Sequence, residues 1–273
     1  MKNNKALSAL LLFTVTLGLL GSTGCKKDDK EPTLKATTYN LKVKDQLGIT
    51  GTVTFTETSS TVTTVTIKLN NGSATNHPAH IHANSAVEGG SIVLSLNPVD
   101  ASGNSTTVVT KLDDNTAINY SQLLDLDGYL NVHESSANIG TIIAQTDIGG
   151  NEITTTQKSY TLATANASGV SGTALFEKRK NGKALVTVSL TGTLANNNYP
   201  ANIRLGSVST IGTTPVRRSL NDVDGASGKS YTNVRTLNDG TPVSYEEWLV
   251  FTGFVRVEDP VTNLPIAEGN IGN

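Results

Sequence analysis

The sequence has 273 residues, of which 16% are charged, and a formal net charge of −2 at pH 7. Because charge is sparse and balanced, no basic face is expected, which excludes nucleic acid as a partner. Threonine, serine, asparagine and glycine are abundant while helix formers are sparse, which favours exposed β-sheet with many turns.

The start of the chain has the features of an export signal. Lys2 and Lys5 precede an apolar run, residues 6–20, that is too short to span a membrane. The following Leu20-Gly-Ser-Thr-Gly-Cys25 resembles a bacterial lipobox, so we expect residues 1–24 to be a lipoprotein signal peptide and Cys25, the only cysteine, to carry lipid. The alternative is an ordinary secretory signal followed by a free cysteine.

Residues 25–34 are expected to form a lipidated tether. Its Lys26-Lys-Asp-Asp-Lys30 is similar to the charged export tag of Bacteroidetes-type surface lipoproteins. That similarity implies a lipid anchor in the outer membrane, with the protein facing the cell exterior. The alternative for this charge run is a merely solvated tether.

The rest of the sequence contains an internal repeat of two similar copies. Gly51-Thr-Val recurs as Gly172-Thr-Ala, and Ser95-Leu-Asn-Pro-Val-Asp as Ser219-Leu-Asn-Asp-Val-Asp. Gly128-Tyr-Leu-Asn-Val recurs as Gly253-Phe-Val-Arg-Val, in the same order along the chain. We therefore predict two tandem domains, residues 35–151 and 158–273, joined by the polar stretch 151–159.

Within each copy the apolar residues alternate with period two, as in half-buried strands. Val65, Ile67 and Leu69 share one face of a predicted strand, and further strands are expected at 92–96, 106–110, 129–133 and 141–145. Asn119-Tyr-Ser-Gln and Ser244-Tyr-Glu-Glu have the form of capping boxes, which predict one helical turn per copy. The predicted fold is all-β, with two antiparallel sandwich or barrel domains.

The first copy contains six motifs in this order: Gly51-Thr-Val-Thr-Phe, His77-Pro-Ala-His-Ile-His, Ser95-Leu-Asn-Pro-Val-Asp, Tyr120-Ser-Gln-Leu-Leu, Gly128-Tyr-Leu-Asn-Val-His and Gly140-Thr-Ile-Ile-Ala-Gln-Thr-Asp-Ile-Gly. With these motifs the first copy resembles a CHRD domain, the module named after chordin and also found in bacterial secreted proteins. The second copy keeps several of these motifs in the same order but lacks the histidines. What the resemblance implies is an extracellular β-rich module; it implies no established activity.

All four histidines of the chain lie in the first copy, at His77, His80, His82 and His133. His80 and His82 are two residues apart on a predicted strand, so their rings leave the same face. If the strand of His133 is a neighbour, three or four imidazoles converge, as zinc, copper or nickel require. Asn131 and Glu134 are candidates for a supporting contact or an extra ligand.

The second copy replaces the four histidines together. The replacements at the matching positions are Tyr199, Asn202, Arg204 and Glu258. If the positions of His82 and His133 touch, Arg204 and Glu258 should form an ion pair across their strands. We therefore predict that His80 or His82 lies against His133.

Three interpretations of the histidines remain open at this point. They form a metal or other ligand site, a network that hydrogen-bonds nearby turns, or a set of unrelated surface residues. No catalytic residues are identified, so an enzyme is the less favoured class. We expect a surface-anchored binding module whose partner is an extracellular protein or glycan, with a zinc or copper site as a candidate. The alternative is a metal-dependent redox or hydrolytic enzyme that uses the same histidines.

Overall fold

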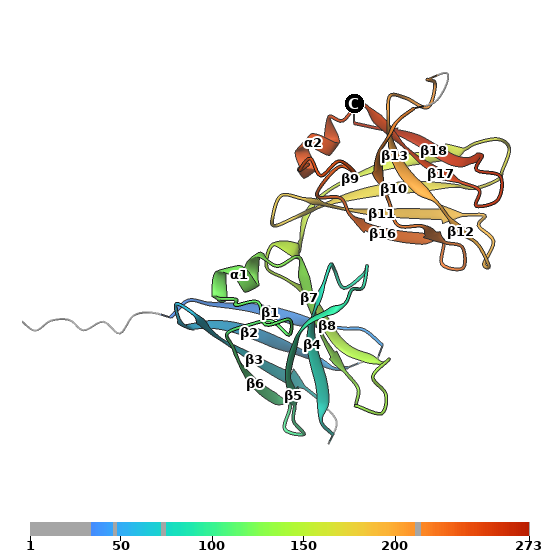
Figure 1. Cartoon of the computed structure of the whole chain (residues 1–273). Coiled ribbons are helices and arrows are strands. Elements are labelled where there is room, and N and C mark those ends of the chain that lie inside the picture. Colours follow the sequence, from blue (N-terminus) through green and yellow to red (C-terminus); the bar gives the residue numbers. More distant parts are fainter. Residues whose placement is uncertain (1–33, 46–47, 72–74, 211–213, 273) are drawn as a thin grey trace, which may run out of the picture. The chain divides into compact units, whose positions relative to one another are not determined.

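The computed structural model describes residues 34–272, apart from 46–47, 72–74 and 211–213. The predicted signal peptide, Cys25 and all but the last residue of the predicted tether lie outside the described residues. Most of the described chain is strand, and it forms two large antiparallel sheets, each curled into a barrel or half-barrel (Figure 1). The predicted all-β class is confirmed.

The first sheet has eight strands in the order β5-β4-β7-β8-β1-β2-β3-β6. Its edge strands are tied by Asn97, whose backbone N–H donates to the Thr107 hydroxyl and whose side chain donates to the Thr106 carbonyl. The sheet therefore curls round until its edges meet. Its elements are β1 (Ala36–Val43), β2 (Thr50–Ser59), β3 (Val62–Asn70), β4 (His77–Ala83), β5 (Ile92–Val99), β6 (Asn104–Val109), α1 (Tyr120–Asp125), β7 (Gly128–His133), β8 (Ile142–Ile148) and the 3-10 turn η1 (Gly149–Asn151).

The second sheet has ten strands in the order β12-β15-β16-β11-β10-β9-β18-β17-β13-β14. If the short strands β12 and β15 are left out and the order is read from β14, it matches the order of the first sheet. In this match β14, β13, β17, β18, β9, β10, β11 and β16 correspond to β5, β4, β7, β8, β1, β2, β3 and β6. Its elements are β9 (Ile153–Thr164), β10 (Ser171–Arg179), β11 (Ala184–Thr191), β12 (Asn198–Tyr199), β13 (Ala201–Leu205), β14 (Val216–Ser219), β15 (Val223–Asp224), β16 (Lys229–Asn233), α2 (Tyr245–Leu249), β17 (Gly253–Glu258) and β18 (Pro265–Ile271).

The core follows the alternation seen in the sequence. Val65, Ile67 and Leu69 on β3 are all buried, while Lys68 between them is exposed. Each sheet encloses its own cluster of buried apolar side chains. Burial of these faces is the main driving force that holds a β-sheet of this kind together.

The two copies share local devices as well as strand order. Both predicted capping boxes are present, at Asn119 with Gln122 and at Ser244 with Glu247. At Gly51 a side chain would collide with the carbonyl oxygen of Lys68, and at the matching Gly172 it would collide with that of Ser189. Glycine is needed at both positions because the neighbouring strand passes so close.

The stretch 151–159, expected to be a polar linker, is largely regular structure. β9 begins at Ile153 and continues to Thr164, because the threonine-rich segment suits a strand and pairs with β10. The chain thus passes from the first sheet to the second within the few residues between β8 and β9. The domain boundaries at 35–151 and 158–273 stay predictions.

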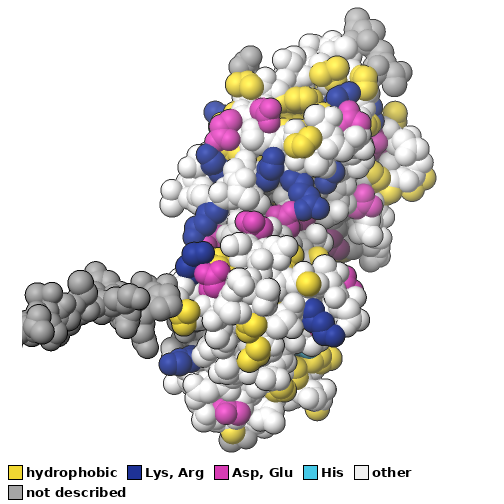
Figure 2. All heavy atoms as spheres, turned by 60° about the vertical axis from the view of Figure 1, so that its left-hand side comes forward, with side chains coloured by type: hydrophobic (Ala, Val, Ile, Leu, Met, Phe, Trp, Pro, Cys, Tyr) yellow, Lys and Arg dark blue, Asp and Glu magenta, His cyan; other side chains and the backbone are white. Residues whose placement is uncertain are grey.

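The surface shows mixed charge. On the face in Figure 2, Lys and Arg side chains lie among Asp and Glu side chains. Within the part of the chain that the structure describes, no helix combines the length and the apolarity needed to cross a membrane.

Candidate metal centre

Two neighbouring strands carry the histidines. β4 pairs with β7 in antiparallel register, with His80 opposite Asn131 and His82 opposite Tyr129. On the inner side of these strands Ile81, Leu130 and Val132 are fully buried in the core. Because side chains alternate along a strand, His80 and His82 project from the opposite, outer face.

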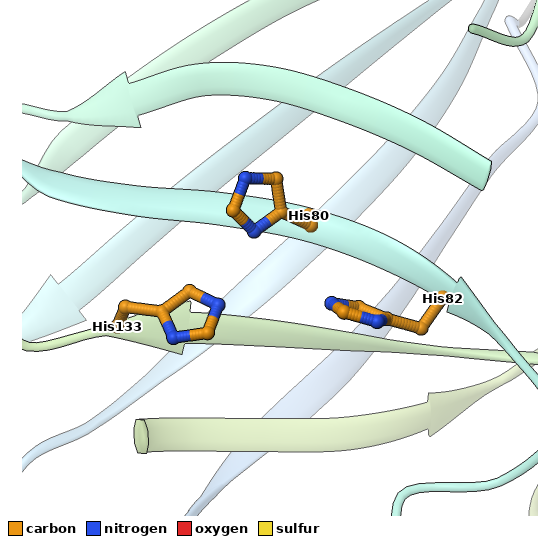
Figure 3. A group of neighbouring side chains, drawn as sticks. All are labelled: His80, His82 and His133. Atoms are coloured by element: carbon orange, nitrogen blue, oxygen red, sulfur yellow. The ribbon is translucent and has the colours of Figure 1, made fainter. Parts of the chain in front are cut away.

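Three of the four histidines converge there. His80 and His82 from β4 and His133 from β7 face a common point (Figure 3), and one potential ligand nitrogen from each lies within 4.8 Å of the others. The ring centroids of His80 and His133 are 5.1 Å apart. The prediction that His133 lies against His80 or His82 is confirmed. Nitrogen ligands lie about 2.0–2.1 Å from a zinc ion, so small ring rotations would bring the three onto one ion.

His82 is oriented by its surroundings. Its Nδ1 lies 2.9 Å from the Gly90 carbonyl oxygen, which can only accept, so Nδ1 carries the proton. The other ring nitrogen, Nε2, lies 3.1 Å from the side-chain oxygen Oδ1 of Asn131. The rings of His82 and Tyr129 are stacked, with their centroids 4.9 Å apart. A histidine whose outer nitrogen donates to a carbonyl is the usual arrangement of a metal ligand, and an ion bound at Nε2 would replace its contact with Asn131.

His80 and His133 each have a buried ring nitrogen, Nδ1, with no hydrogen-bond partner among the described residues. Burial lowers the pKa of His80, and the neighbouring His133 and His82 lower it further. Burial also lowers the pKa of His133, although a hydrogen bond with the Ile139 backbone acts in the other direction. A buried nitrogen without a hydrogen-bond partner destabilises the fold. A neutral imidazole is a good metal ligand, and a bound ion would supply the missing partner of its lone pair.

Two loops cover the cluster. All six residues of β7 are buried, although the outer face of such a sheet is often solvated. The segment 84–91 contributes the Gly90 carbonyl that holds His82, and the segment 134–141 contributes the Ile139 backbone that contacts His133. The site therefore lies between the sheet and these loops, with His80 as its least buried member.

No family model, curated protein or solved structure matches this chain. The chemistry of the site is therefore inferred from its own geometry and from the second copy.

The second copy fills the same three positions differently. β13 pairs with β17 in the same register, with Asn202 opposite Arg256 as His80 is opposite Asn131. There Arg204 donates from Nε to Asn202 at 2.8 Å and from Nη2 to Glu258 at 2.9 Å. The predicted ion pair between Arg204 and Glu258 is confirmed. In the second copy, the hydrogen-bonded guanidinium group of Arg204 thus lies at the positions where the first copy has three imidazole rings.

The structure separates His77 from the other three histidines. Its Nδ1 lies 2.7 Å from the Glu134 carbonyl oxygen and 3.2 Å from that of His133, and it is outside the group of converging nitrogens. The carboxylate of Glu134 is also outside that group, while Asn131 contacts His82. Alternation along β4 already separates His77 from His80, since it has the parity of the buried Ala79. The roles of Gly90 and Ile139 had no comparable signal in the sequence.

Proposed function

We propose that this chain is a lipid-anchored cell-surface binding protein, and that His80, His82 and His133 form a transition-metal site in its first sheet. Zinc and copper are the ions that the donor set suits best, because imidazole is a preferred ligand of both. The remaining partner of the protein would be an extracellular protein or glycan.

The observation that carries the metal site is the convergence of three imidazoles from two strands. Two of them have an unpartnered buried nitrogen, and the third is oriented through Gly90. A purely structural network would instead satisfy these nitrogens, as Arg204, Asn202 and Glu258 satisfy one another in the second copy.

The surface anchor and the CHRD-type module rest on sequence features. The anchor follows from the lipobox-like segment ending at Cys25 and the charged residues after it. The module follows from the motifs shared by the first copy and CHRD domains, with which an all-β fold agrees. Together these features favour a binding role outside the cell.

A second candidate is a metal-dependent redox or hydrolytic enzyme built on the same histidines. The observation in its favour is the number of protein ligands. Structural zinc sites normally have four protein ligands, whereas catalytic ones have three and an open position. The described chain brings three such side chains together here.

The metal site is tested by measuring bound metal. Residues Leu34–Asn273 form a compact unit, so a chain of residues 31–273 without tag histidines retains the whole described fold. We expect one zinc or copper ion per chain by mass spectrometry, lost in His80→Ala. Asn202→Ala, at the matching position of the second copy, should leave the metal content unchanged. A wild-type chain that stays metal-free under saturating zinc and copper would refute the site.

A further inference from the structure

A short turn next to the histidine site carries a carboxylate, that of Asp113. Its two oxygens accept from the Ser95 backbone N–H at 3.0 Å, and one of them also accepts from the Ser95 hydroxyl at 2.8 Å. Ser95 is on β5, exposed between the buried Leu94 and Leu96, and lies opposite His80 in the pairing with β4. Because opposite residues of neighbouring strands have Cβ atoms about 4.5–5.5 Å apart, Ser95 holds the carboxylate on the outer face beside His80.

The charge of Asp113 acts on the histidine site from outside it. Burial and the neighbouring His133 and His82 lower the pKa of His80, whereas Asp113 raises it. In the described chain its oxygens are not among the ligand atoms that lie within 4.8 Å of one another. Asp113 therefore influences the site through its charge, and not as a fourth ligand.

The second copy has the same turn without this charge. Residues 112–116 and 237–241 are each closed by a hydrogen bond from the N–H of the first residue, a leucine, to the carbonyl of the last, a threonine. Asn238, at the position of Asp113, accepts from the Ser219 backbone N–H at 3.0 Å and donates to the Ser219 hydroxyl at 3.2 Å. An amide thus makes the contacts that the turn requires at this position.

The next residue of the turn is acidic in both copies. Asp114 accepts from the Thr116 N–H at 2.8 Å, and Asp239 accepts from the Thr241 N–H at 2.9 Å. This acid is therefore part of the turn itself. The charge at Asp113 instead occurs in the copy that has the histidines, and it is replaced by an amide in the copy that lacks them.

We propose that Asp113 is the charge partner of the metal site, and that its carboxylate attracts the divalent ion that the three converging histidines bind. The inference rests on the proposed metal site and adds a residue that sets its affinity for a cation. A carboxylate and a divalent cation attract each other even without contact, but between exposed groups the attraction is screened by salt. Asp113 is exposed, so its contribution should be present at low ionic strength and largely lost at high ionic strength.

The test is a zinc titration of residues 31–273 and of the variant Asp113→Asn at two ionic strengths. Asparagine suits this position, because Asn238 makes the same contacts in the second copy. At about 20 mM salt the zinc affinity of Asp113→Asn should be about fivefold or more below that of the natural chain, and at about 1 M salt the two should agree within about twofold. A loss that is the same at both ionic strengths would show a structural role and overturn the proposal.

Two further variants are matched controls. Asp114→Asn removes the same charge from the next residue, where asparagine can still accept from Thr116, and should lower zinc affinity less than Asp113→Asn does. Asn238→Asp adds the carboxylate to the second copy and should leave zinc affinity unchanged. Equal zinc affinities of the natural chain and Asp113→Asn at low salt would overturn the role of Asp113 while leaving the metal site intact. A natural chain that binds no zinc would overturn both.

Discussion

At the scale of single residues, the bond from His82 Nδ1 to the Gly90 carbonyl determines which nitrogen can bind an ion. The protonated Nδ1 is fixed outward, so Nε2 faces His80 and His133. His80 and His133 have no such bond at Nδ1 within the described chain, and their neutral state comes from burial. Orientation and protonation are thus set by different means at the three rings.

The metal-free protein should lose stability in mild acid because of these rings. His80 and His133 have folded-state pKa values below the ordinary 6.5, so below that pH the unfolded chain binds more protons than the folded one. Their effect is absent above pH 6.5, and the free energy of unfolding falls as the pH drops below it. Urea unfolding with a chelator present, from neutral pH to below 6.5, measures this. The double variant His80→Asn, His133→Gln should show a shallower loss; an identical slope would contradict the assignment.

His77 is expected to support the site without binding the ion. His77→Ala removes a buried side chain and the partner of the Glu134 carbonyl, which should lower the free energy of unfolding by about 2–4 kcal/mol. His77→Asn retains an N–H near the position of Nδ1, so it should lose less and still bind one zinc ion. Urea unfolding and zinc stoichiometry measure both effects. If His77→Asn loses zinc as His80→Ala does, His77 is a ligand after all.

At the scale of elements, the strands and helical turns could be predicted because their signals are local. The alternation of Val65, Ile67 and Leu69 and the capping box at Asn119 each depend on a few adjacent residues. The proximity of His133 to the histidines of β4 was predicted from the replacement of His82 and His133 by Arg204 and Glu258 in the second copy. The loops over the site could not be predicted, because Gly90 and His82 meet through folding and not through any sequence pattern.

The loop of residues 84–91 gives an element-scale prediction. A side chain at Gly90 would collide with the Ala83 carbonyl oxygen, so Gly90→Ala must displace the loop that holds His82. We expect a loss of about 1–3 kcal/mol in the free energy of unfolding and a fall in zinc affinity of about tenfold or more. Urea unfolding and zinc titration measure these changes.

Gly140 in the other covering loop is the control for that experiment. A side chain there meets no atom within 4 Å, so Gly140→Ala should change stability by no more than about 0.5 kcal/mol. If both variants behave alike, the Gly90 carbonyl does not orient His82.

At the scale of the whole molecule, one strand arrangement is used twice with different chemistry on the same face. The first copy has the histidines and Asn131, and the second has an ion-paired arginine with Arg256 at the place of Asn131. Because the registers of the two strand pairs agree, the side chains should be exchangeable between the copies without changing the fold.

Moving the site into the second sheet should create a second metal centre. The substitutions are Asn202→His, Arg204→His and Glu258→His, with Arg256→Asn to remove the positive charge that faces the new site. The variant should bind two zinc ions per chain where the natural chain binds one, as measured by mass spectrometry. A variant that folds but still binds one ion would show that the covering loops of the first copy are also required.

The most direct test of the central claim is a zinc titration by calorimetry of the natural chain and of the reverse exchange. The reverse variant carries His80→Asn, His82→Arg and His133→Glu, which give the first sheet the hydrogen-bonded set that the second already holds. We predict one zinc ion per natural chain and none for the variant, with both chains unfolding cooperatively in urea. Equal zinc binding by the two chains would show that the three histidines are not the metal site.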